Sequence, residues 1–207
     1  MVKSHLCPIS GHVDPEDMRM YPSLETPRLI LRRLTLDDAE ALANAINHPK
    51  IAATTTNIPH PYNPDDARSW IESHLDDSIT SDSLPFGLFL RESGELIGGA
   101  ELSSIDKINL KAELGYWCAV DFWGRGYTTE AARAIVDYGF RELNLERIYA
   151  RCFDINPASA RVMEKIGMTF EGTARREYRK NDVFHDFRHY AILRDDWGGK
   201  SVSETLA

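Results

Sequence analysis

The spacing of apolar and polar residues predicts seven strands and four helices. Alternation with a period of two is typical of half-buried strands, and recurrence every three or four residues is typical of amphipathic helices. The expected strands are residues 26–34, 86–91, 95–104, 114–120, 147–153, 169–178 and 184–193. The expected helices are residues 37–47, 64–78, 128–143 and 157–166. In chain order this gives one strand, two helices, three strands, a helix, a strand, a helix and two strands.

Residues with special backbone preferences mark several boundaries. Asn156 fits the N-cap of the last helix, Pro157 its first turn and Gly167 its left-handed stop. Pro49 is expected to stop the first helix. Residues 51–63 contain two further prolines and three consecutive threonines, and they are expected to form a loop. Loops of this length in compact domains often carry function, so this segment is a candidate functional loop.

The central part of the chain has the pattern of an anion site. An apolar strand at residues 114–120 leads into the turn Gly124-Arg125-Gly126, and a helix opens at Thr128 or Thr129. The apolar stripe of this helix comprises Ala131, Ala132, Ile135, Val136, Gly139, Phe140 and Leu143. N–H groups in the first turn of a helix lack intrahelical partners and lie at the positive end of the helix dipole, so they attract phosphates.

This pattern also has a structural interpretation, a tight turn that binds no ligand. Thr129 stands where the dinucleotide fingerprint has its third glycine, and no Gly-Lys-Ser/Thr follows as in a Walker loop. The hydroxyls of Thr128 and Thr129 are therefore either phosphate ligands or N-caps.

Composition and charge exclude several classes of protein. The 207 residues, 43% hydrophobic and 27% charged, suit one soluble domain, expected at residues 25–197 between an irregular arm (1–24) and a tail (198–207). A net charge of −8 opposes nucleic-acid binding. Three widely spaced cysteines, Cys7, Cys118 and Cys152, suggest neither disulfides nor a metal site. With no signal-peptide or membrane-spanning apolar run, a cytoplasmic protein without membrane contact is expected.

Six ordered motifs carry a resemblance to a known family. They are TPRLILRRL, HPYNPDDARSWI, ELIGGAEL, ELGYW, WGRGYTTEA and NPASARVMEKIGM. Across residues 24–197 the chain resembles the GNAT superfamily of acyl-CoA-dependent N-acetyltransferases, and more closely its RimJ/RimL branch, which acetylates ribosomal-protein N-termini. In the superfamily pattern Gln/Arg-x-x-Gly-x-Gly/Ala, Trp123 replaces the first residue and Thr128 the last, while Gly126 keeps the central glycine.

The resemblance implies an α+β fold with α/β/α layers. Its mixed seven-stranded sheet would splay between the fourth and fifth strands, with about four helices, and the pantetheine arm of acetyl-CoA would enter the splay. The implied cofactor-binding residues are Trp117, Cys118, Ala119 and Val120 along the arm, Arg125, Gly126, Tyr127, Thr128 and Thr129 at the diphosphate, and Asn156. The Val120 amide would also face the thioester oxygen. The structural alternative is that residues 117–120 form an ordinary core strand.

The resemblance also suggests which residues handle protons. Ser159, in the first turn of its helix, would donate to the departing sulfur, although it is also simply a first-turn serine. Glu101 and Glu113 are the candidate bases, acting through water, and each is equally readable as a structural carboxylate. His185 and His189 share one face of the last strand and are interpreted as packing residues.

The function implied is transfer of acetyl from acetyl-CoA to a primary amine by direct attack in a ternary complex. No activated Cys or Ser nucleophile supports a covalent intermediate. The acceptor is either a protein N-terminus or a small amine such as an antibiotic or a polyamine. A non-catalytic acyl-CoA sensor is the alternative from another class. Both a monomer and a homodimer are compatible with the sequence.

Overall fold

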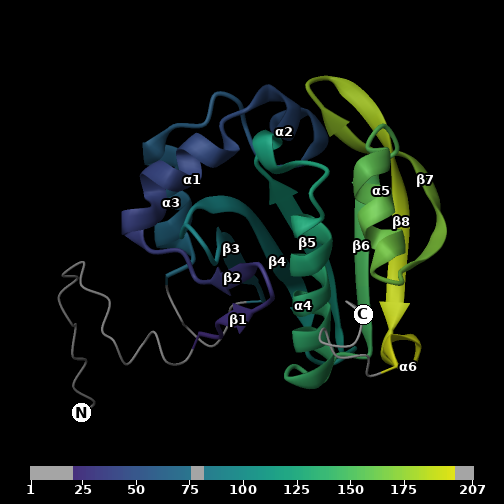
Figure 1. The fold of residues 1–207 in the computed structure, drawn as a ribbon. Helices are drawn as coiled ribbons and strands as arrows, with labels where there is room; N and C mark the ends of the chain where they lie inside the picture. Colours follow the sequence, from purple (N-terminus) through teal and green to yellow (C-terminus); the bar gives the residue numbers. More distant parts are fainter. Residues whose placement is uncertain (1–20, 76–81, 199–207) are drawn as a thin grey trace, which may run out of the picture.

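An eight-stranded sheet lies between two layers of helices in the part of the chain that the structure describes (Figure 1). The structure is a computed structural model that describes residues 21–75 and 82–198. The strands are β1 Leu24–Glu25, β2 Leu29–Arg32, β3 Leu84–Leu90, β4 Leu96–Asp106, β5 Lys111–Cys118, β6 Arg147–Phe153, β7 Thr169–Lys180 and β8 Val183–Leu193. They are ordered β1-β2-β3-β4-β5-β6-β8-β7. All seven predicted strands form, and β1 adds the eighth.

The helices comprise the four that the sequence predicts and two more. They are α1 Ala39–Ile46, α2 Pro49–Thr54, α3 Pro64–Ser73, α4 Tyr127–Arg141, α5 Pro157–Lys165 and α6 Arg194–Trp197, with 3-10 turns η2 Leu36–Asp38 and η3 Val120–Phe122. Residues 1–20 of the expected arm (1–24), residues 199–207 of the expected tail (198–207) and residues 76–78 of the second expected helix lie outside the described residues.

Three predictions about element boundaries were wrong for local reasons. Helix α1 ends before Pro49, as predicted, but Pro49 also opens α2, because proline fits the first turn of a helix and the His48 side chain accepts a hydrogen bond from the Lys50 N–H. Part of the expected loop at residues 51–63 is therefore helical. The strand expected to reach Val120 ends at Cys118, where the chain curls into η3. Helix α3 ends at Ser73, and His74 follows it as the C-cap.

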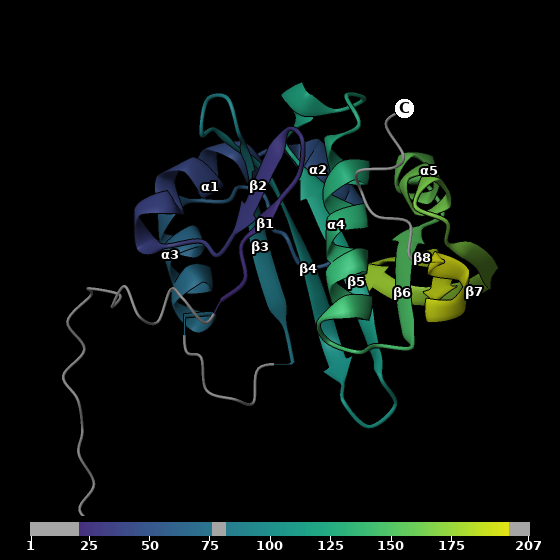
Figure 2. The same ribbon diagram turned by 60° about the horizontal axis from the view of Figure 1, so that its bottom comes forward.

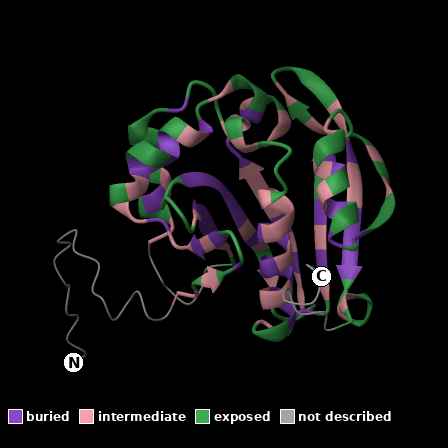
Figure 3. Ribbon diagram, viewed as in Figure 1, coloured by how far each residue is buried: buried purple, intermediate pink, exposed green. Residues whose placement is uncertain are grey.

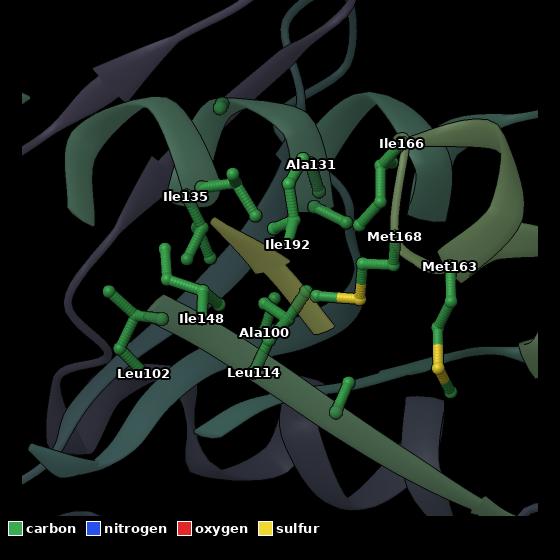
Figure 4. Packing of buried hydrophobic residues seen from close by; sticks show 14 of the residues in the cluster. Ala100, Leu102, Leu114, Ala131, Ile135, Ile148, Met163, Ile166, Met168 and Ile192 are labelled. Carbon is green, nitrogen blue, oxygen red and sulfur yellow. The ribbon is translucent and has the colours of Figure 1, made fainter. Parts of the chain in front are cut away.

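Each face of the sheet has its own hydrophobic core. On one face, α4 and α5 pack on β4, β5, β6 and β8, and Figure 4 shows Ile135 of α4 above Leu102, Ile148 and Ile192. Gly139 allows this close approach, since a Cβ at that position would lie 2.8 Å from Ile148 Cδ1. On the other face, α1, α2 and α3 bury a second cluster against β3 and β4. Figure 3 shows the burial concentrated on these inner surfaces.

The only parallel strand pair among the described residues separates after three positions. β5 pairs with β6 through Lys111↔Arg147, Ala112↔Ile148 and Glu113↔Tyr149, whereas all other neighbouring pairs are antiparallel. Both strands continue beyond this point, β5 to Cys118 and β6 to Phe153, without pairing. The predicted splay between the fourth and fifth expected strands is confirmed.

An ion pair fixes the start of α1 against the sheet. Arg32 of β2 donates from both terminal nitrogens to Asp38, at 2.8 and 2.9 Å. Asp38 also accepts the Thr35 N–H at 2.8 Å, completing a capping box. Burial raises the pKa of Asp38, but the hydrogen bonds from Arg32 and Thr35 outweigh burial and hold the pKa of this carboxyl below its ordinary value.

We expect Asp38→Asn to lower the free energy of unfolding near neutral pH by about 1–3 kcal/mol, the cost of losing hydrogen bonds to a charged group. Because the folded-state pKa is depressed, the stabilisation is present above the unfolded pKa and is lost as the pH falls through the folded value. Urea unfolding near neutral pH and in acid should show the difference shrinking in acid. The exposed neighbour variant Asp37→Asn is the control, and an equal loss at both pH values would contradict the ion-pair explanation.

Candidate functional site

A cavity of about 800 Å³ occupies the splay and extends beneath α1 and α2. Its walls come from β4 and β5 on one side, β6 and α5 on the other, and the turn before α4 at one end. Among the predicted site residues, the cavity is lined by Glu101, Glu113, Trp117, Cys118, Gly126, Thr128, Thr129, Asn156 and Ser159. The fold thus gathers residues from four separate elements around one space, next to the unpaired parts of two strands.

The backbone of β5 is only partly available to a ligand. The Ala119 N–H donates to the Ile97 carbonyl at 2.8 Å, so this amide faces β4 and not the splay. Because backbone groups alternate along a strand, those of Cys118 face the opposite way, towards the splay. The Cys118 carbonyl accepts the Trp123 indole N–H at 2.7 Å. The expectation that the whole stretch 117–120 offers free backbone groups was therefore too broad.

The turn before α4 leaves the first turn of the helix without a side-chain cap. Gly126 is the N-cap residue, in the left-handed region at φ 82°, and α4 begins at Tyr127. The interpretation of Thr128 or Thr129 as the N-cap was wrong, because both lie inside the helix. Both line the cavity, so their N–H groups and hydroxyls are placed at the positive end of α4. The arrangement suits a phosphate.

The N-terminus of α5 approaches the cavity from the opposite wall. Asn156 caps the helix, because its side chain accepts the Ser159 N–H at 3.2 Å. The predicted N-cap is confirmed. The Tyr116 hydroxyl, from β5, lies 3.0 Å from both the carbonyl oxygen and the Oγ of Ser159. Burial raises the pKa of Tyr116, which keeps its phenol protonated as a permanent hydrogen-bond partner of Ser159.

Tyr116 was missed as a site residue although it stands inside the ELGYW motif. Its alternation along β5 places it on the face that packs against α4 and α5. The sequence does not show that this face meets the first turn of α5, because that contact spans 43 residues. Tyr116 thus links β5, on one side of the splay, to α5 on the other side.

The two candidate bases lie on the opposite face of the sheet, in different environments. Glu113 is ion-paired with Arg151 at 2.9 Å, and Arg151 also contacts Glu177 at 3.1 Å. Glu101 lies over Gly115, where a Cβ would come within 3.2 Å of its Oε1. Burial raises the pKa of Glu101; the nearby Glu113 adds to the rise, and His74 opposes it. The raised pKa brings Glu101 nearer to neutral pH than an ordinary glutamate, which favours proton transfer.

The end of the cavity beside α2 is covered by a contact between distant segments. Lys180, near the tip of the β7–β8 hairpin, donates to the carbonyls of Ala52 and Thr55, and the Tyr178 hydroxyl donates to the Thr56 carbonyl at 3.2 Å. Figure 1 shows this hairpin beside α2. Burial lowers the pKa of Lys180. Residues 54–58 of the segment expected to be a functional loop line the cavity.

The two histidines of β8 have separate environments. His185 packs on the Phe153 ring, with centroids 4.9 Å apart, while His189 pairs with Glu177. Within residues 21–75 and 82–198, no group of three or more His, Cys, Asp or Glu side chains could hold a metal ion. In the same residues, no helix has the length and apolar character needed to cross a bilayer.

Comparisons with known proteins agree with this geometry. The acetyltransferase (GNAT) domain model matches residues 28–169. The uncharacterized N-acetyltransferase YoaA of Bacillus subtilis is 31% identical over 84% of this chain and 98% of its own. The ribosomal-protein-serine acetyltransferase of Escherichia coli is 31% identical over 49% of this chain and 56% of its own. Its name agrees with the predicted RimJ/RimL-type branch.

A similar solved structure contains bound CoA and spermine. The spermidine N-acetyltransferase of Vibrio cholerae, in complex with CoA and spermine, superposes with a TM-score of 0.72 at 26% identity. The match covers 84% of this chain and 100% of that one. The predicted fold class and the resemblance to the GNAT superfamily are confirmed.

Glu101→Gln should stabilise the fold, because it removes a carboxylate whose ionisation is opposed by burial. With the folded pKa raised, the penalty is absent below the unfolded pKa and grows as the pH rises through the folded value. We therefore expect a higher melting temperature above neutral pH and none of this gain in acid. Thermal melts across pH test this, with the exposed Glu92→Gln as control. A gain that does not depend on pH would contradict the assignment.

Proposed function

This chain belongs to the GNAT family of acetyltransferases, and we propose that it moves acetyl from acetyl-CoA to a primary amine by direct attack in a ternary complex. The observation that carries the proposal is the separation of β5 from β6 after Glu113↔Tyr149. The resulting cavity is lined by Ser159 on one side and by carboxylates on the other.

The donor end of the cavity fits the chemistry of acetyl-CoA. The uncapped first turn of α4, with Thr128 and Thr129, suits the diphosphate, and the backbone N–H of Cys118, which faces the splay, suits a carbonyl of the pantetheine arm. Asn156 would align the arm at the opposite wall. Acetyl-CoA supplies an acetyl group activated as a thioester, so the protein has only to position it, accept a proton and donate one.

Glu101 is the better candidate to accept the proton of the amine. A primary amine must lose its proton to attack, and a carboxylate with a raised pKa is a better match to an amine than an ordinary one. Glu113 is a weaker candidate because Arg151 occupies its Oε1. Its proposed role is to hold Arg151 at the rim of the pocket and to add negative charge beside Glu101.

Proton donation to the departing sulfur falls to Ser159. Its N–H is fixed by Asn156 and its hydroxyl by Tyr116, so the side chain is preorganised at the positive end of α5. Burial raises the pKa of both Cys118 and Cys152, which keeps these thiols protonated and poorly nucleophilic. This supports transfer without a covalent enzyme intermediate.

For the acceptor we favour the α-amine of a protein N-terminus over a polyamine. Arg151 pairs with Glu113, and Lys180 binds backbone carbonyls at the covered end of the cavity. Glu101 has a hydrogen bond with Ser83 and lies near His74, but no Lys or Arg among the described residues pairs with it, so we assign the acceptor cation to Glu101. One such carboxylate suits one amine, whereas a polyamine has several charges to match. The name of the Escherichia coli relative supports the same choice, and the spermine-bound neighbour supports a small amine as the second candidate.

Replacing the proposed proton-transfer groups tests the catalytic assignment. We expect Glu101→Gln to lower kcat about 10²–10⁴-fold, the usual contribution of general acid–base catalysis. Ser159→Ala should lower kcat, and Glu113→Gln should do so least. Thiol release is measured with acetyl-CoA and a peptide amine, using Glu92→Gln as the matched exposed control. Unchanged turnover in all three variants would overturn the roles. CoA binding without turnover of any amine would favour a sensor, and no binding would remove the donor site.

An acceptor panel separates the two substrate classes. We expect faster turnover of peptides with a free α-amine than of the same peptides acetylated at the N-terminus with only a lysine amine, because an α-amine has a pKa near 8 and a lysine amine one near 10.4. Spermidine and spermine complete the panel. If the polyamines have the higher kcat/KM, the small-amine function replaces the protein N-terminus as the conclusion.

A further inference from the structure

An arginine far from the glycine turn in sequence lies directly against it. Arg28 follows β1 in the chain, and Figure 2 shows β1 and β2 beside α4. Its Nη1 donates to the Arg125 carbonyl at 3.0 Å, and its Nε donates to Glu130 at 2.6 Å. The guanidinium also lies 4.5 Å from the centroid of the Tyr127 ring. The Arg28 guanidinium thus contacts three residues at the start of α4, namely Arg125, Tyr127 and Glu130.

The bond to the Arg125 carbonyl sets the direction of the next amide. In a trans peptide the C=O of one residue and the N–H of the following residue point in opposite directions. Holding the Arg125 carbonyl towards Arg28 therefore turns the Gly126 N–H away from Arg28. Gly126 lines the cavity, so its amide is oriented together with the uncapped amides of α4. A flip of this peptide would present a carbonyl oxygen where an anion is to bind.

Arg28 also neutralises a negative charge near the N-terminus of α4. Glu130 lies one turn into α4, and its side chain is only 11% exposed. A carboxylate at this position would repel a phosphate at the helix N-terminus. Glu130 accepts hydrogen bonds from the Thr26 hydroxyl at 2.7 Å and the Arg28 N–H at 2.9 Å, in addition to the guanidinium. The carboxylate is thereby neutralised and directed away from the turn.

We propose that Arg28 is a positioning residue of the donor site, which orients the 125–126 peptide and neutralises Glu130 so that the turn accepts the diphosphate of the donor. This inference rests on the proposed function, because it requires an acyl-CoA donor. The TPRL motif at residues 26–29 would then contribute to the affinity for the donor. The alternative role is purely structural, in which Arg28 only fastens the β1–β2 turn to α4.

A donor that lacks the diphosphate distinguishes these roles. Wild type, Arg28→Gln and Arg28→Lys are compared with acetyl-CoA and with S-acetylpantetheine, which ends before the diphosphate. We expect Arg28→Gln to raise the KM for acetyl-CoA by about tenfold or more, because it removes charge-assisted hydrogen bonds, with kcat unchanged and S-acetylpantetheine kinetics unaffected. Arg28→Lys keeps the positive charge but lacks the several N–H donors of the guanidinium, so its KM for acetyl-CoA should lie between those of wild type and Arg28→Gln. Arg91→Gln is the control, since Arg91 contacts Glu25 and the Thr26 carbonyl of the same turn but not α4.

Each outcome decides the question. Equal losses with both donors, or no loss with either, would overturn the inference in favour of a fold-only contact. Calorimetry with CoA distinguishes failure of the Arg28 role from failure of the proposed function. If wild type does not bind CoA, the donor assignment itself fails. If wild type binds CoA and Arg28→Gln binds it equally well, only the role of Arg28 fails. Should Arg28→Gln not fold, the comparison of the two donors with Arg28→Lys decides in the same way.

Discussion

The separation of β5 from β6 is the constraint on which the rest of the site depends. A parallel pair that stops after three positions leaves backbone groups on both strands without strand partners, and buried unpaired groups of this kind are costly. The protein meets part of this cost itself, because the Trp123 indole N–H satisfies the Cys118 carbonyl. The Tyr116 hydroxyl also crosses the opening, to Ser159 of α5. What remains is a polar edge inside a cavity, which a ligand with amide groups can complete.

Two helix N-termini converge on this opening from different sides. α4 begins at a glycine turn and α5 at an asparagine cap, and the first turns of both line the same cavity. Their dipoles favour negative charge at one face of the sheet, whereas Glu101 and Glu113 place negative charge at the other. In the proposed reaction an anionic donor and a cationic acceptor would therefore bind at opposite faces, and they would meet through the gap between the strands.

The same arrangement places function in tension with stability. The buried carboxylate that is best suited to accept a proton is one whose ionisation the fold opposes, as its raised pKa shows. Elsewhere the protein pairs its partly buried charges: Arg32 with Asp38, Arg151 with Glu113, and Arg28 with Glu130. Each of these pairs contains an arginine, whereas Glu101 has a hydrogen bond with Ser83 and a nearby His74 but no such partner among the described residues.

The sequence by itself determined the local elements. Periodicity located all seven main strands and the four main helices, and the residues Asn156 and Pro157 fixed the start of α5, because capping and turn formation depend on neighbours a few positions away. The ordered motifs also indicated the family and the splay.

Only the tertiary structure decided which distant side chains meet. It showed that Pro49 opens a helix, that Ala119 faces β4, that Tyr116 supports Ser159, and that Arg151 occupies Glu113 while Glu101 is left in the pocket. The contact of Arg28 with Glu130 spans 102 residues. Such contacts depend on strand order and on how helices pack across the sheet, which the spacing of residues along one segment does not encode.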